Sequence, residues 1–223
     1  MALTTKLFYI STCVGLTLGC GQPADVPMPQ IPPETPELVQ EQRVDMLIEA
    51  AITVVSIKDG SINVTGEFPN VTGDLSMVNV ATWGGLTGSL DIPLATWDSS
   101  NELRDTRVRD VLFGVQDNPI AVFEITSIDG IPSGGVGVGA MRRATLRGEV
   151  RFADSSQEVL LPIEINRIGE RRFEFESVGP AVISIEAVQL GSGLRSLIRL
   201  CGHQSVEDSV EVSISGRMGV ELR

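Results

Sequence analysis

From about Ile52 onward, apolar and polar residues alternate in short runs that are rich in β-branched residues. Alternation with a period of two is typical of strands that bury one face. Turn-forming residues separate the runs, as in Lys58-Asp59-Gly60 and Gly179-Pro180. The pattern predicts strands at residues 61–65, 86–94, 120–125, 145–152, 158–165, 172–178, 181–189, 206–214 and 218–222.

These runs predict an all-β fold, because many short strands with one apolar face form either a sandwich or a closed barrel. A barrel of about eight strands has an interior wide enough for side chains or one slim ligand. Gly88, Ala121 and Gly148 lie on the predicted inward faces beside larger apolar residues. That mixture leaves room for a chain-shaped molecule, although a filled core is the commoner result of such alternation.

Two segments interrupt the strands. Residues 101–113 predict a short charged helix with Ser100 or Asn101 as its N-cap. Residues 193–201 predict a second short amphipathic helical turn. We therefore expect one or two short helices beside the strands.

Arg104 shares one face of the first predicted helix with Val108 and Leu112. A guanidinium on an apolar face needs a partner. The partner is either the headgroup of a ligand or, more simply, a carboxylate such as Glu102 or Asp105 that pins the helix. We favour the structural pin.

The N-terminal segment has the layout of an export signal, with Lys6 followed by an uncharged, mostly apolar run over residues 7–18. The run is too short to span a bilayer as a helix. Its end resembles a bacterial lipobox, in which the cysteine is acylated, although Thr17 departs from that motif. We expect residues 1–19 to be removed and Cys20 to carry the lipid anchor, with ordinary secretory cleavage as the alternative.

Residues 20–51 predict a tether between the anchor and the folded domain. Six of the twelve prolines fall between residues 21 and 36, and such a segment is extended and buries no core. Residues 37–50 form either a short helix or the end of the tether. The predicted barrel domain then occupies residues 52–223.

Composition excludes several functions. The net charge of −12 excludes a nucleic-acid partner bound through phosphates. Cys201 and His203 are the reactive pair left in the mature chain, too few ligands for zinc. Catalysis by this pair would need both side chains to meet and a third group to orient the histidine. We expect no metal, no cofactor and no enzymatic activity, with an envelope enzyme that uses Cys201 or His203 as a minor alternative.

The segment from residue 86 to 125 resembles the YceI-like family of bacterial lipid-binding proteins. The resemblance rests on Trp97-Asp98-Ser99-Ser100, Asn101-Glu102-Leu103-Arg104-Asp105, Val111-Leu112-Phe113, and Asn118-Pro119 with Phe123-Glu124. Thr145-Leu146-Arg147-Gly148 is similar to the family's next strand. Glu149–Gln157 and Gly191–His203 depart from the family pattern.

The resemblance implies a closed antiparallel, lipocalin-like barrel of about eight strands that holds a polyisoprenoid or similar amphiphile inside. We expect the ligand to be an isoprenoid lipid or a quinone-like molecule, bound for carriage or sequestration. The predicted contact residues are Leu86, Leu90, Ile92, Arg104, Phe113, Phe123, Ile125, Leu146, Val150 and Phe175.

The predicted location is the bacterial cell envelope, on the periplasmic or outer surface, with membrane attachment through N-terminal acyl chains. The sequence leaves open whether the domain forms a homodimer. The alternative function is a structural or interaction lipoprotein with a filled barrel. An open cavity in the barrel favours the lipid-binding interpretation over this alternative.

Overall fold

The computed structural model describes residues 43–220. Its helical segments are η1 (Leu94–Thr96), α1 (Glu102–Arg107), the π-helical turn η2 (Val108–Phe113) and α2 (Gly191–Cys201). Its strands are β1 (Val44–Lys58), β2 (Ile62–Met77), β3 (Thr87–Pro93), β4 (Ile120–Asp129), β5 (Met141–Phe152), β6 (Ser155–Gly169), β7 (Arg172–Ser177), β8 (Ala181–Ser184) and β9 (Val206–Val220).

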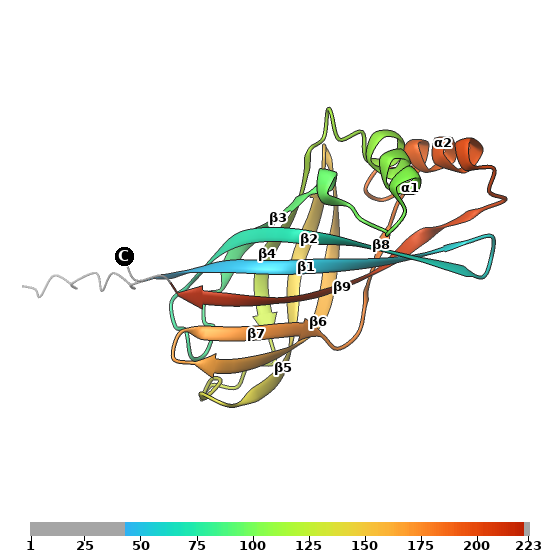
Figure 1. The fold of residues 1–223 in the computed structure, drawn as a ribbon. Coiled ribbons are helices and arrows are strands. Elements are labelled where there is room, and N and C mark those ends of the chain that lie inside the picture. The colour runs from blue at the N-terminus through green and yellow to red at the C-terminus, as the bar shows by residue number, and fades with distance from the viewer. Residues whose placement is uncertain (1–42, 221–223) are drawn as a thin grey trace, which may run out of the picture. The chain divides into compact units, whose positions relative to one another are not determined.

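Eight of the described strands close into an antiparallel barrel in the order β1-β2-β3-β4-β5-β6-β7-β9, and β9 pairs back onto β1. The ninth strand, β8, pairs with β9 beyond the end of β7. Figure 1 shows the strands around the barrel, with α1 and α2 together at one end. The predicted all-β, closed antiparallel barrel with short helices is therefore confirmed.

Strand β1 begins at Val44, ahead of Ile52, so the helix interpretation is wrong over residues 44–50. Met46, Ile48 and Ala50 are buried and alternate with exposed residues, which is the strand period. Pairing with both β2 and β9 fixes this segment as a strand. The predicted signal, lipidation site and most of the tether lie outside the described residues.

The C-terminal part of the barrel also differs from the predicted boundaries. Residues 206–214 and 218–222 are predicted as separate strands, yet residues 206–220 form the single strand β9. Gly216 permits this, because a Cβ at that position would lie 2.5 Å from the Glu49 carbonyl oxygen on β1. Residues 185–189 leave the strand predicted for 181–189 and form a turn before α2.

The two helices cover one end of the barrel. Asn101 caps α1, since its side-chain oxygen accepts a hydrogen bond of 3.0 Å from the Arg104 backbone N–H. Gly193 lets α2 lie directly on η2, because a Cβ there would lie 2.7 Å from the Leu112 carbonyl oxygen. Among the described residues, no helix is long and apolar enough to cross a membrane.

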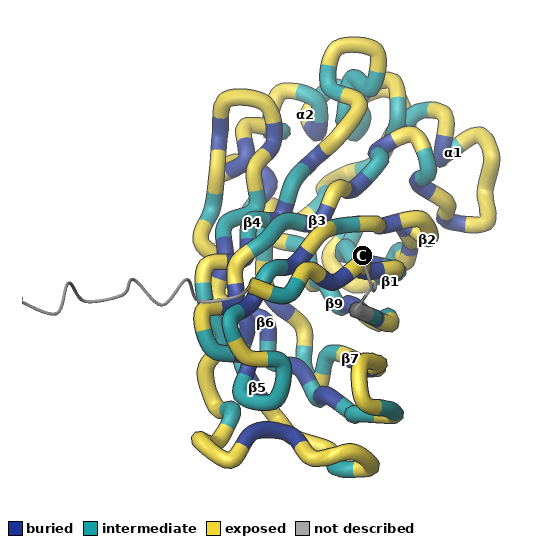
Figure 2. Tube along the Cα trace, turned by 90° about the vertical axis from the view of Figure 1, so that its left-hand side faces the viewer, coloured by how far each residue is buried: buried dark blue, intermediate teal, exposed yellow. Residues whose placement is uncertain are grey.

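The opposite end of the barrel is filled by side chains. Trp83 and Phe173 are fully buried there and meet edge to face, with ring centroids 5.3 Å apart. Arg167 lies over the Phe173 ring and donates to the Val136 carbonyl oxygen at 2.8 Å. Figure 2 shows buried and exposed residues alternating along the strands around this core. The described residues thus hold their own closed sheet and core, so we expect residues 40–223 to fold as a unit.

One part of the barrel wall lacks a backbone ladder. Pairing between β6 and β7 ends at Ile163 and Ser177, and β8 then runs beside the first half of β6. The Gln157 carboxamide bridges this seam, since Nε2 donates to the Val182 carbonyl oxygen at 3.0 Å. The Ser184 backbone N–H donates to Gln157 Oε1 at 2.8 Å. A single side chain therefore makes the two hydrogen bonds that a neighbouring strand would make.

Replacing Gln157 with alanine removes both of these bonds and leaves two backbone groups of β8 without partners. We expect Gln157→Ala to lower the free energy of unfolding by about 1–2 kcal/mol. Urea denaturation measures this loss. Glu158→Ala, on the neighbouring exposed position of the same strand, is the control and should change stability by less than about 0.5 kcal/mol. Equal effects of the two changes would show that the bridge contributes nothing.

Candidate functional site

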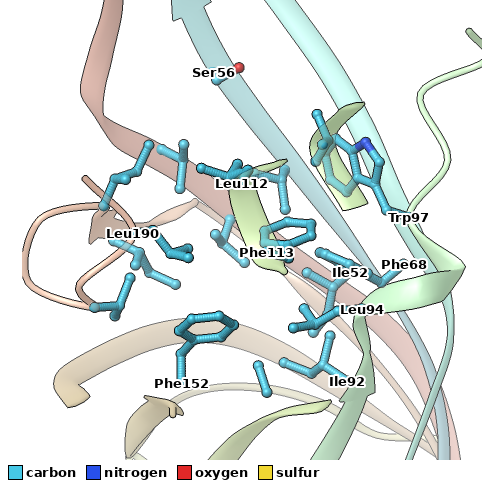
Figure 3. A pocket seen from close by; sticks show the side chains of 18 of the residues that line it. Ile52, Ser56, Phe68, Ile92, Leu94, Trp97, Leu112, Phe113, Phe152 and Leu190 are labelled. Carbon is cyan, nitrogen blue, oxygen red and sulfur yellow. The ribbon is translucent and has the colours of Figure 1, made fainter. Parts of the chain in front are cut away.

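The barrel end beneath the helices contains an apolar cavity of about 250 Å³. Inward side chains of the strands form its wall, and side chains of α1, η2 and α2 form its roof. Figure 3 shows Ile92, Leu94 and Phe152 on one side of this space and Leu112 and Leu190 on another. Because few polar groups face it, the space favours an apolar occupant over water.

The cavity is elongated along β1. Alternate residues from Ile52 to Lys58 line it, including Val54 and Ser56. With a rise of about 3.3 Å per residue, this stretch of strand is roughly 20 Å long. The cavity is therefore long and narrow, and it changes from an apolar to a polar lining along β1.

Three aromatic rings form one wall of the cavity. Phe68, Trp97 and Phe113 all contact one another: the Phe68 ring centroid lies 5.1 Å from that of Trp97 and 5.9 Å from that of Phe113, and the other two are 6.1 Å apart. The Trp97 indole lies against Gly66, where a Cβ would come within 2.2 Å of its ring. Figure 3 shows the three residues near one another at one side of the cavity. Glycine on β2 is thus required for the indole to form this wall.

The structure brings most of the predicted contact residues to one cavity. Six of them line it: Leu90, Ile92, Arg104, Phe113, Phe123 and Val150. Four others are buried in the filled part of the barrel and do not line the cavity: Leu86, Ile125, Leu146 and Phe175. Alternation identifies the inward face of a strand, but the height of a residue along the barrel depends on strand register. Cys20 lies outside the described residues.

The glycines expected to leave room do not do so. A Cβ at Gly88 would lie 2.6 Å from the Leu75 side chain, and one at Gly148 would lie 2.6 Å from the Phe123 ring. Larger neighbours therefore occupy the space beside both glycines. Among the predicted small inward residues, Ala121 is the one that lines the cavity.

Sequence analysis missed the part of the cavity formed by α2, β8 and β9. Leu194 and Leu197 on α2 face the cavity, as do Ile183 on β8 and Val210 and Val212 on β9. The apolar stripe of α2 was visible in its helical spacing. Its role was not, because nothing in the spacing indicates that this helix folds over the barrel end.

Arg104 is a structural pin, although its partner differs from the predicted carboxylate. Its guanidinium donates to the Ser99 hydroxyl at 2.6 Å and to the Ser99 carbonyl oxygen at 2.7 Å. The Asp105 carboxylate in turn accepts from the Ser99 hydroxyl and from the Ser99 backbone N–H. Ser99 therefore joins the cation to the buried carboxylate and holds α1 over the cavity.

Asp59 joins the β1–β2 turn to the segment between α2 and β9. Its carboxylate accepts hydrogen bonds from the backbone N–H groups of Gln204 at 2.8 Å and Ser205 at 3.3 Å. Its other oxygen lies 3.5 Å from His203 Nδ1. The backbone N–H groups of Gln204 and Ser205 are the main cause of the lowered pKa of Asp59. This contact holds together the polar end of the cavity, where Cys201 and His203 join the lining.

Comparison with known proteins identifies the family to which this chain belongs. A model of the YceI-like domain matches residues 46–218. The chain belongs to the YceI-like family. No curated protein matches the chain, but solved structures share its fold. The resemblance carried by residues 86–125 is thereby confirmed for the whole barrel.

Three solved structures illustrate this likeness. A polyisoprenoid-binding domain from Saccharophagus degradans has a TM-score of 0.67 and 17% identity, over 81% of this chain and 100% of that one. Burkholderia cenocepacia BcnA has a TM-score of 0.58 and 16% identity, over 75% of this chain and 95% of that one. The Campylobacter jejuni YceI protein has a TM-score of 0.55 and 17% identity, over 75% and 91%. These likenesses establish the fold.

The Asp59 contact predicts a pH-dependent stability. Because the pKa of Asp59 is lowered by folding, its carboxylate stabilises the fold above the ordinary aspartate range, and this contribution is lost as the pH falls through the folded pKa. Asp59→Asn should therefore lower the urea midpoint at pH 7 and change it less at about pH 3. Asp154→Asn, at an exposed turn between β5 and β6, is the control. A pH-independent difference would contradict the assignment.

Proposed function

We propose that this protein binds a chain-shaped apolar lipid, a polyisoprenoid or quinone-like molecule, inside the barrel. The observation that carries the proposal is the long apolar cavity beneath α1, η2 and α2. Removing apolar surface from water contributes about 25 cal/mol per Å², so a lipid chain enclosed along this cavity is held without specific polar contacts. An unfilled cavity favours this function over that of an interaction lipoprotein with a filled barrel.

The family supports the same class of ligand. The Saccharophagus degradans relative is described as a polyisoprenoid-binding domain, and its barrel is covered completely by the likeness to this chain. At 17% identity the likeness does not carry individual contacts across. The choice between a polyisoprenoid and a quinone-like molecule therefore belongs to the experiment.

The proposed mechanism is binding without turnover. Asp59 contacts His203 at 3.5 Å, so the histidine has an orienting group. However, no hydrogen bond among the described residues joins His203 to the Cys201 thiol, whose neighbour is Arg107 Nη1 at 3.5 Å. A nucleophile needs its base within hydrogen-bond reach, and this pair does not meet that condition.

The proposed site of action is the bacterial cell envelope. Removal of residues 1–19 and acylation of Cys20 would attach the barrel to a membrane, which is also the reservoir of apolar lipids. Expression of the full chain in a bacterium and mass spectrometry of the mature N-terminal peptide tests this step. An acylated Cys20 at the mature N-terminus supports the proposal. A mature N-terminus that begins at another residue and carries no acyl chain contradicts it.

The function is tested on residues 40–223 purified without detergent. Native mass spectra, followed by denaturation and analysis of the organic extract, should show one apolar molecule released per folded chain. A bare protein should instead take up geranylgeraniol or a short-chain ubiquinone. If the bare protein takes up neither, the lipid-binding proposal fails and the interaction lipoprotein is favoured.

A substitution that fills the cavity should abolish lipid uptake. Ala181 is buried on the inward face of β8 and lines the cavity, whereas its neighbour Val182 is exposed. We expect Ala181→Phe to reduce uptake of geranylgeraniol at least tenfold while Val182→Phe leaves it unchanged. Thermal melting of both variants checks that each still folds. Unchanged uptake by a folded Ala181→Phe protein would place the lipid elsewhere.

The two tryptophans should report differently on an occupant. Trp97 lines the cavity, whereas Trp83 is buried against Phe173 in the filled end. Addition of geranylgeraniol should therefore change the fluorescence of the native chain and of Trp83→Phe, but not that of Trp97→Phe. Equilibrium uptake, measured by mass spectrometry, confirms that Trp97→Phe still binds. A fluorescence change that persists in Trp97→Phe and disappears in Trp83→Phe would show that the lipid binds at the Trp83 end of the barrel.

A further inference from the structure

The charges along the cavity are opposite in sign to those of the chain. The basic residues that line the cavity are Lys58, Arg104 and His203, and no aspartate or glutamate lines it. The whole chain nevertheless has a net charge of −12. The described residues that line the cavity thus include basic side chains but no carboxylate. Such a distribution favours an occupant with negative charge.

Lys58 is the most informative of these cations. It is the last residue of β1, where it pairs with Val206 of β9, and its side chain is half-buried. It is the only lysine between residues 43 and 220. Within that range no salt bridge or hydrogen bond engages its ammonium group. A partly exposed ammonium group without a protein partner is solvated by water, which the acceptor oxygens of an anionic ligand can replace.

The carboxylate next to Lys58 makes no salt bridge with it, and the charge of Lys58 is only the smallest cause of the lowered pKa of Asp59. Asp59 is the adjacent carboxylate, but it accepts from the Gln204 and Ser205 backbone N–H groups and lies against His203. It does not line the cavity.

Of the two arginines of α1, Arg104 lines the cavity, whereas Arg107 contacts the lining residue Cys201. Arg107 Nη1 lies 3.5 Å from the Cys201 sulfur, which lines the same end as His203. The Nε and Nη2 groups of Arg104 donate hydrogen bonds to Ser99, and its Nη1 has no hydrogen-bond partner among residues 43–220. The guanidinium of this lining residue therefore has a fixed orientation and keeps one donor group without a partner among the described residues.

We propose that the lipid bound by this protein has an anionic oxygen headgroup, a phosphate or a carboxylate, which Lys58 receives at the polar end of the cavity. This inference rests on the proposed lipid-binding function and assigns the direction of the ligand. The head lies among Lys58, His203 and the α1 arginines, and the chain runs along β1 toward Ile52. A neutral alcohol or quinone would leave the ammonium of Lys58 without a charged partner.

The test compares lipids that differ only in their heads. Binding of geranylgeraniol and geranylgeranyl monophosphate to residues 40–223 is measured by calorimetry below their micelle concentrations. We expect the phosphate to bind at least about tenfold more tightly than the alcohol, because a charge-assisted hydrogen bond forms only with the phosphate. Palmitate and hexadecanol form a second pair, which shows whether the preference extends to a carboxylate or is confined to phosphate.

Lys58 is tested by Lys58→Met, with Lys58→Arg as the conservative variant. Lys58→Met should reduce the preference for the anion to less than about threefold, and Lys58→Arg should retain the preference. Arg142→Met is the matched control, since it removes one positive charge from an exposed β5 residue that does not line the cavity. This control should keep the full preference.

The outcomes separate this inference from the proposed function. If alcohols and anions bind equally, or if Lys58→Met and Arg142→Met act alike, the anionic headgroup is rejected while lipid binding stands. If no lipid of either pair binds, lipid binding fails and the headgroup assignment fails with it. A preference for phosphate alone identifies a phosphorylated lipid, and a preference for carboxylate alone identifies a fatty acid.

Discussion

Pairing of β1 with both β2 and β9 is the constraint on which the rest of the molecule depends. This strand closes the barrel, so the sheet has no free edge along it. It also determines which side chains of β1 face inward. Met46 and Ile48 enter the filled end, whereas Ile52 and Val54 line the cavity. One closed ladder thus separates a packed core from a space suited to a ligand.

The two ends of the barrel are closed in different ways. Trp83 and Phe173 fill one end with close-packed rings, which leaves no room for an occupant. Helical segments cover the other end, held by the link from Arg104 through Ser99 to Asp105. Covering a cavity with helices requires polar contacts at the rim, because the interior beneath supplies few atoms for packing. The Asp59 contacts serve the same purpose where the β1–β2 turn meets the segment between α2 and β9.

Several elements of this fold could be predicted from local pattern. The alternation of apolar and polar residues predicted the positions of β3 to β7, and Asn101 was one of the two residues predicted as the N-cap of α1. Leu90, Ile92 and Phe123 were correctly predicted to face inward. Strand β1 was missed over residues 44–50 because these residues pair with residues 71–77 of β2 and 216–220 of β9, which are far from them in sequence. The two strands predicted at the C-terminus are one, since Gly216 meets the backbone of β1 there.

By itself, the sequence determined the fold class, the family and the inward faces of the strands, because alternation and family motifs involve residues that are close in sequence. Only the tertiary structure decided which inward residues are packed and which line a cavity. Leu86 and Leu90 share a face, but Leu90 alone lines the cavity. Likewise, α2 and Lys58 meet the cavity through sheet closure and helix placement. Position along a barrel depends on register between strands distant in sequence, which no local pattern contains.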